Sequence, residues 1–156
     1  MAAPQVCSLI TTGPQLIPAG EAYTVVRFPF GTESYDEHGM HDPAQPDGET
    51  ATDGHPRAGL IWPSADGWAD LYAMLFWPDG GYNEVRDRFV RDPLDLSTGH
   101  DSTCTQDHAP TPGGQYLAKT WGMFVKVGTP VSVMVRHNSG SGVNLDFAEF
   151  KLAIHV

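Results

Sequence analysis

Residues 68–77 read WADLYAMLFW and form the strongest apolar stretch of the chain. In a β-strand, successive side chains point to opposite faces, and here both faces are apolar. One face would carry Leu71, Ala73, Leu75 and Trp77, and the other would carry Tyr72, Met74 and Phe76. The turn residues at 78–81 end the stretch, and its length favours a strand over a helix. We therefore expect a central strand that is covered on both sides, either between two sheets or against a partner chain.

The segments around this stretch also have the composition of strands separated by turns. The 17 glycines and 13 prolines are dispersed as turn residues and form no repeat. Apolar, β-branched and aromatic residues recur at 23–30, 57–63, 84–92, 115–127, 131–136 and 144–156. Residues 31–58 and 93–114 are polar and rich in turn residues, so we expect two long loops there, the first with short irregular strands. The sequence therefore predicts an all-β protein, an antiparallel jelly-roll β-sandwich.

Residues 1–20 differ from the rest of the chain, because they contain Pro4, Pro14 and Pro18 and only short apolar pieces. We expect this segment to be extended. Two interpretations are open: a first strand of the sandwich, or an arm that docks on another protein. We assign residues 1–20 as an extended N-terminal arm and residues 21–156 as the jelly-roll domain.

The charge balance excludes several classes of partner. The chain carries 19 acidic and 9 basic residues, a formal net charge of −10. A nucleic-acid surface needs a basic patch, and binding to an anionic membrane also needs basic residues, so we expect neither partner. The N-terminal segment lacks the basic start and the apolar run of a signal peptide. No stretch of about 18 apolar residues occurs, so we expect no membrane-spanning helix.

The two cysteines, Cys7 and Cys104, are far apart in the sequence. They form no CxxC or other spacing typical of zinc ligands. They could pair, but disulfides belong to oxidising compartments. Without a recognisable signal peptide, we expect free thiols.

The order of these pieces resembles the C1q/tumour-necrosis-factor-like family over about residues 22–156. In that family an early aromatic strand leads into an excursion around a Tyr-Asp pair, then a strand ending in Pro, then a Gly before an aromatic strand. A Gly-x-x-Val turn, a small-residue hairpin and an apolar strand close the chain. The matching pieces are Tyr35-Asp36, residues 60–63, Asp66-Gly67 before residues 68–77, residues 128–135, residues 138–142 and residues 150–156. The chain departs from the family at Thr129, where Asp is usual after Gly, and in the long loop at 93–114.

The resemblance implies a homotrimer in which one sheet of each copy faces the three-fold axis. On this basis we expect the trimer interface at Tyr72, Met74, Phe76, Phe150 and Leu152. The chain is also similar to small virion proteins of tailed bacteriophages that use this fold as trimeric capsid decorations. The resemblance thus implies a structural protein on the outer capsid surface, made in the host cytoplasm and bound to the major capsid protein. The residues expected to contact the capsid are those of the arm, Gln5, Val6, Leu9, Ile10, Leu16 and Ile17.

A second function for the same fold is a binding module, such as a tail-fibre or receptor-binding tip that recognises a host-surface glycan or protein. The four tryptophans would then be candidates for a sugar-stacking platform. We favour packing in the core and the trimer interface as their role. These residues are Trp62, Trp68, Trp77 and Trp121.

Residues 36–42, DEHGMHD, are the segment most suggestive of metal chemistry. If a metal bound there, the ligands would be His38, His41 and Asp42, because imidazole and carboxylate suit divalent metals. Two histidines at this spacing share one side only in a helix, and Gly39 argues against a helix. We therefore expect a polar loop and no metal.

No pattern in the chain indicates an enzyme. The His-x-His of cupin enzymes is absent, and so is the Gly-x-Ser-x-Gly turn of hydrolases. The pairs His100-Asp101 and Asp107-His108 lie in an expected loop, where solvated polar residues are the rule. We expect no catalytic residues and no cofactor.

Overall fold

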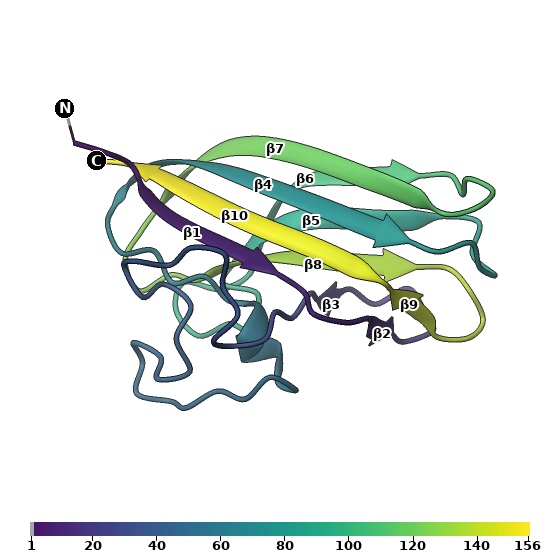
Figure 1. Cartoon of the computed structure of the whole chain (residues 1–156), viewed down its shortest axis with the longest axis horizontal. Helices are drawn as coiled ribbons and strands as arrows, with labels where there is room; N and C mark the ends of the chain where they lie inside the picture. Colours follow the sequence, from purple (N-terminus) through teal and green to yellow (C-terminus); the bar gives the residue numbers. More distant parts are fainter. Residues whose placement is uncertain (1) are drawn as a thin grey trace.

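Strand β4 (Gly67–Trp77) contains the apolar stretch and lies inside an antiparallel sheet with the order β1-β10-β4-β7. The structure is a computed structural model that describes residues 2–156 (Figure 1). The other strands of this layer are β1 (Gln5–Ile10), β7 (Gln115–Val125) and β10 (Phe147–His155). We call this layer the β4 sheet. The central position predicted for residues 68–77 is confirmed, because β4 has a paired strand on each side. The expected cover over both faces is found on one face only, since Trp68 and Tyr72 are exposed.

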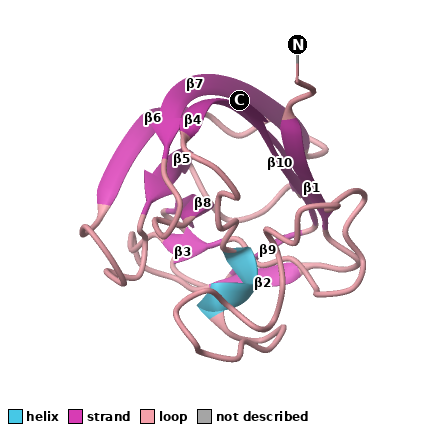
Figure 2. Cartoon of the chain, turned by 90° about the vertical axis from the view of Figure 1, so that its left-hand side faces the viewer, coloured by secondary structure: helices cyan, strands magenta, loops and turns pink. Residues whose placement is uncertain are grey.

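The second layer, called the β8 sheet, is antiparallel with the order β3-β8-β5-β6. Its strands are β3 (Thr24–Val25), β5 (Val85–Arg91), β6 (Asp101–His108) and β8 (Val131–His137). A short pair, β2 (Gln15–Ile17) and β9 (Val143–Leu145), completes the fold. Figure 2 shows the two layers end-on, with the β4 sheet arched over β8 and β3. The predicted fold class, an antiparallel all-β sandwich, is confirmed.

The hydrophobic core lies between the two sheets. The inward positions of β4 are those predicted by alternation, and each is at most 5% exposed: Leu71, Ala73, Leu75 and Trp77. The β8 sheet contributes Val131, Val133 and Val135, all with no exposed surface. At the centre, the Phe150 ring of β10 lies 6.0 Å from the Phe89 ring of β5 and 6.3 Å from the Phe28 ring, so aromatic contacts join the layers.

The N-terminal segment is part of the sandwich. Strand β1 pairs with β10 along its whole length, with Cys7 opposite Leu152. Cys7, Leu9 and Ile17 belong to the core and have no exposed surface. The assignment of residues 1–20 as a separate arm is therefore wrong, and the alternative interpretation as a first strand is confirmed. The prolines that indicated an arm lie outside β1.

The two long loops differ from each other. The long loop predicted at 31–58 is confirmed. The short irregular strands expected within it are not found, since it contains only isolated bridges and the 3-10 turn η1 (Pro56–Gly59). Figures 1 and 2 both place it on the side of the sandwich away from β7. The expected loop at 93–114 is wrong in part, because it contains β6, an edge strand whose polar side chains gave no apolar signal. Within residues 2–156, no helix is long and apolar enough to cross a membrane.

Two expected strands are shorter than the sequence suggests. Residues 23–30 form only the two-residue β3, extended by a bond from the Val26 amide to the Val133 carbonyl. Residues 57–63 form η1 and then a single bridge between Ile61 and Val131. Both segments still place apolar side chains in the core, since Val26, Leu60 and Ile61 have no exposed surface.

Candidate functional site

The outer face of the β4 sheet, turned away from the core, carries a group of large apolar side chains. On β4, Trp68 is 54% and Tyr72 is 41% exposed. On β7, Tyr116 is 69% and Phe124 is 44% exposed. Together with two half-buried neighbours they form what we call the aromatic face: Trp68, Tyr72, Met74, Phe76, Tyr116 and Phe124. Exposed apolar patches of this kind mark interaction sites in soluble proteins.

The register between β4 and β7 brings the rings of the aromatic face together in pairs, with Asp70 lying between Trp68 and Tyr72 on β4. Trp68 lies opposite Phe124 and Phe76 lies opposite Tyr116, with the Phe76 and Tyr116 ring centroids 4.5 Å apart. Two glycines leave room for these rings. A Cβ at Gly122 would lie 2.6 Å from Trp68 Cζ2, and a Cβ at Gly114 would lie 2.8 Å from Phe76 Cζ. The Trp68 and Phe76 rings can therefore lie against the sheet because residues 122 and 114 have no side chains.

Charged residues lie beside the aromatic face, mostly on β10. Lys151, opposite Tyr72, lies 3.7 Å from Glu149. His155 Nε2 lies 2.7 Å from Asp70 Oδ2 and pairs with it as an ion only when the imidazole is protonated. Such partly exposed pairs contribute little stability. The face is thus mostly apolar, with Asp70 inside it and the charged residues of β10 along one edge. Apolar surface edged by polar groups is the composition of protein–protein interfaces.

The predicted trimer-interface residues fall into two groups. Tyr72, Met74 and Phe76 lie on the aromatic face, as the sequence places them on one side of a strand. Phe150 and Leu152 have no exposed surface and lie in the core, so their assignment to an interface is wrong. The outward residues of β10 are those at the alternate positions, Phe147, Glu149, Lys151, Ala153 and His155. Trp68 is among the tryptophans expected in the core or the trimer interface. Sequence reasoning missed Tyr116 and Phe124, although alternation along β7 could have found them.

The residues predicted to contact a capsid do not form one surface. Leu9 and Ile17 are core residues with no exposure, so the prediction is wrong for them. Gln5, Val6 and Ile10 are partly covered within β1, and the Gln5 side chain accepts a hydrogen bond from Ser64. Leu16 is 61% exposed and lies against Gly142 of the neighbouring hairpin.

The histidine-rich loop is held by its own hydrogen bonds. Asp36 accepts bonds of 2.8 Å from the amides of Met40 and His41. The buried His41 ring contacts Glu33 Oε1 at 2.6 Å and the Ala58 carbonyl at 2.7 Å, so both of its nitrogens are engaged. His38 and Asp42 are exposed at the surface. Within residues 2–156 no group of three or more potential ligands is placed to hold a metal ion.

Both cysteines are free thiols, as the sequence predicts. Cys7 is buried, and burial raises the pKa of its thiol far above the ordinary value, with the negative charges of Asp36 and Glu33 adding to the effect. A neutral thiol in an apolar site is a poor nucleophile. Cys7 therefore serves packing and not chemistry.

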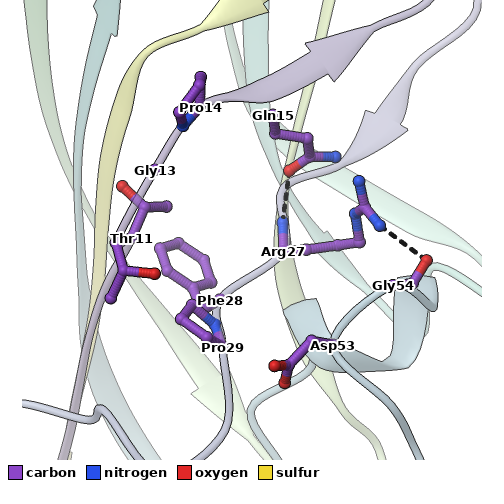
Figure 3. A pocket seen from close by; sticks show the side chains of 10 residues that line it. Thr11, Gly13, Pro14, Gln15, Arg27, Phe28, Pro29, Asp53 and Gly54 are labelled. Atoms are coloured by element: carbon purple, nitrogen blue, oxygen red, sulfur yellow. Dashed lines mark hydrogen bonds between the residues drawn. The ribbon is translucent and has the colours of Figure 1, made fainter.

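An open cleft of about 310 Å³ lies beside β2 (Figure 3). Its polar groups bond to the protein's own backbone. The Gln15 side chain accepts from the Arg27 amide at 2.8 Å and donates to the Val25 carbonyl at 3.0 Å, and Arg27 Nη1 donates to the Gly54 carbonyl at 2.7 Å. Asp53 accepts from the Phe30 amide at 2.9 Å. These hydrogen bonds connect the segments around β2 and β3. They do not place a nucleophile next to a base.

The four tryptophans do not gather into a sugar-binding platform. Trp77 is fully buried and Trp62 is 5% exposed, so both belong to the interior. Trp68 and Trp121 reach the surface, at 54% and 44% exposure. The packing role favoured from the sequence is confirmed for Trp62 and Trp77.

Several solved structures share this arrangement of strands across nearly their whole length. The Eiger TNF of S. frugiperda is 12% identical, with 99% of this chain and 94% of that chain covered and a TM-score of 0.60. The globular domain of zebrafish complement 1qA is 10% identical, with 97% and 98% covered and a TM-score of 0.62. The fold is that of the TNF and C1q globular domains. Murine APRIL at pH 5.0 is also similar, with 13% identity, 95% and 98% coverage and a TM-score of 0.56.

The TNF/C1q-like jelly roll predicted from the sequence is thus confirmed as a fold. No protein-family model matches the sequence, and no curated protein matches it. At 10–13% identity the likeness concerns the arrangement of the strands and not the ligands of these proteins.

Proposed function

We propose that the protein is a non-enzymatic structural module that assembles as a homotrimer through the aromatic face. The observation that carries this proposal is the exposure of Trp68, Tyr72, Tyr116 and Phe124 on one face of the β4 sheet. A second supporting point is the TNF/C1q-like fold, whose resemblance implies that one sheet of each copy faces a three-fold axis. The aromatic face lies on the outer surface of the β4 sheet. In the proposed trimer, this sheet faces the three-fold axis.

Apolar burial on this face can exceed the repulsion between acidic copies. A standard interface buries about 1,600 Å². At about 25 cal/mol per Å², apolar burial on that scale contributes tens of kcal/mol, against association costs of roughly 4–15 kcal/mol. Each copy carries a net charge of −10, but repulsion between exposed charges is screened beyond about 10 Å in ordinary salt. The trimer should therefore tighten as salt is added.

The trimer is tested by placing one charge in the aromatic face. Tyr72→Glu puts a carboxylate in the middle of the face, beside Met74 and opposite Thr120, where a partner copy would have to desolvate it. We expect a folded monomer by light scattering, with an unchanged circular dichroism spectrum. The matched control is Val127→Glu, at a residue that is 59% exposed and lies outside the face. A Tyr72→Glu protein with the mass of the wild-type protein would refute the proposed interface.

We further propose that this trimer is a capsid decoration protein of a tailed bacteriophage, bound to the major capsid protein on the outer surface of the virion after synthesis in the host cytoplasm. Support comes from the sequence pattern that resembles such virion proteins. The acidic charge of −10 suits a surface that must not adhere to its neighbours. One trimer that touches several capsid subunits gains affinity by avidity and holds those subunits together. Among the predicted contact residues, Leu16 remains the most exposed.

The number of copies per particle tests the virion function. Decoration requires many copies on each capsid, which quantitative mass spectrometry of purified particles would detect. A few copies per particle, located on the tail, would support the alternative of a tail-fibre or receptor-binding module. Absence from purified particles would overturn both.

A further inference from the structure

Three ionisable side chains, Lys119, Asp87 and His108, form a cluster between the two sheets. Lys119 comes from β7 of the β4 sheet, and Asp87 and His108 come from β5 and β6 of the β8 sheet. Lys119 Nζ lies 2.6 Å from Asp87 Oδ1, and His108 Nε2 lies 2.9 Å from Asp87 Oδ2. Lys119 also donates to the Cys104 carbonyl. The cluster therefore bridges the two layers where β6 and β7 form their edges.

The Lys119–Asp87 pair is almost completely removed from water. The exposed fractions of the two side chains are 3% and 1%, and the Phe89 ring lies 5.1 Å from Nζ. Two opposite charges in such a site carry a large desolvation cost. Transfer of one proton from Nζ to Oδ1 would leave a neutral amine beside a neutral carboxylic acid. An amine and an acid fixed in contact are the reactants of an amide.

We propose that Lys119 and Asp87 join through an isopeptide bond, with His108 as the acid–base group. Reacting groups held in contact behave as if they were present at about 10⁵–10⁸ M, which favours condensation of a pair already within hydrogen-bonding distance. Water is excluded from the two reacting groups, so hydrolysis is disfavoured. His108 is 21% exposed at its side chain, so its ring reaches the solvent while it contacts Asp87.

The step balances without any other reactant. The Nζ lone pair of Lys119 forms a bond to the carboxyl carbon of Asp87, and the bond from that carbon to Oδ2 breaks. His108 Nε2 delivers one proton to the departing Oδ2 and takes up one proton from the nitrogen. The proton first transferred to Oδ1 moves to Oδ2 as the C=O bond at Oδ1 forms again. Two hydrogens of the original ammonium leave with Oδ2 as water. An ammonium and a carboxylate thus become one amide and one water molecule.

The isopeptide bond would join the two sheets near the edge of the sandwich formed by β6 and β7. Strands β6 and β7 lie in different sheets and share no ladder of hydrogen bonds. A covalent link from β5 to β7 would restrict the unfolded chain between residues 87 and 119, as a disulfide does. This inference does not depend on the trimer or on the virion, since the bond lies within one chain.

The mass of the intact, denatured full-length protein tests the proposal. We expect a mass lower than that of the unlinked chain by one water molecule, and a protease digest in which the peptides containing residues 87 and 119 are joined. Lys119→Met lacks the amine and should show the full mass expected for its sequence. Lys126→Met changes an exposed lysine and should keep the loss of one water. Wild-type protein at full mass would overturn the proposal, as would a loss of water that persists in Lys119→Met.

His108 has a separate test. His108→Gln removes the acid–base group, so freshly synthesised protein should contain a larger unlinked fraction that decreases with time. In the wild-type protein the linked fraction should appear faster and with a pH dependence that the His108→Gln protein lacks. Equal rates and equal pH profiles in the two proteins would remove His108 from the mechanism.

Discussion

Trp68 on β4 covers Gly122 on β7, and the two residues fit because residue 122 has no side chain. A Cβ at Gly122 would lie 2.6 Å from Cζ2 and 3.1 Å from Cε2 of the Trp68 indole. The absence of that one carbon lets the ring rest against the sheet, beside Phe124 in the opposite register position. The shape of the aromatic face is thus set by a glycine as well as by its aromatic residues.

Substitution of Gly122 should disturb the aromatic face without unfolding the sandwich. In Gly122→Val, the new side chain displaces the Trp68 indole, so we expect self-association to weaken by at least about tenfold, or about 1.4 kcal/mol. Sedimentation equilibrium measures this change. Gly13→Ala is the control, since nothing lies within 4 Å of a Cβ at Gly13. Unchanged association in Gly122→Val would show that Trp68 is not part of an interface.

Phe150 should act as a core residue and not as an interface residue. Phe150→Ala removes the ring that packs against Phe28 and Phe89, and such truncations cost about 3–5 kcal/mol of folding free energy. Tyr35→Ala, at a side chain that is 47% exposed, should change stability by no more than about 0.5 kcal/mol. Urea unfolding at one fixed protein concentration compares the two variants. Similar small losses in both would contradict the position of Phe150 between the sheets.

Strand β1 should be required for folding. Leu9→Asp places a carboxylate in the core beside β10, so we expect loss of the cooperative unfolding transition. Leu16→Asp, at a residue that is 61% exposed, should leave folding intact. Circular dichroism and thermal melting follow both. A folded Leu9→Asp protein would restore the interpretation of residues 1–20 as a separate arm.

Cys7 should make the protein less stable in alkaline solution. Because the folded state keeps the Cys7 thiol neutral, only the unfolded chain releases this proton as the pH rises above the ordinary thiol pKa of 9.0. The unfolded state then binds fewer protons, so the contribution falls with pH by about 1.4 kcal/mol per unit. Below that pKa, Cys7 has no effect on the slope. Urea unfolding of wild-type and Cys7→Ala proteins between about pH 8 and 10 should give a steeper decline for the wild type. Parallel curves would contradict the buried, neutral thiol.

The sandwich could be predicted because its central strands have strong periodic patterns. Residues 68–77 alternate between a core side and an outer side, and the alternation of Val131, Val133 and Val135 places them in the core. Turn residues between the strands indicated the antiparallel order. These signals are local, so one sequence is enough to detect them.

The remaining features depend on contacts between distant parts of the chain. The composition of β6 is polar and does not indicate a strand. The segment is extended because it pairs with β5. The resemblance implies an interface position for Phe150, whereas the register of β10 against β4 decides which face it occupies and places it in the core. The cluster of Lys119, Asp87 and His108 comes from three strands, and the sequence places His108 in a loop. The one local feature of the sequence that indicates this cluster is Lys119, a lysine at an inward position of β7.

The molar mass of the wild-type protein in solution tests the central claim most directly. Light scattering coupled to size-exclusion chromatography should give three times the 16.9 kDa of one chain, at micromolar concentration and physiological salt. The aromatic face would then be covered by two further copies. A molar mass of 16.9 kDa under the same conditions would contradict the trimer and leave the face exposed for some other partner.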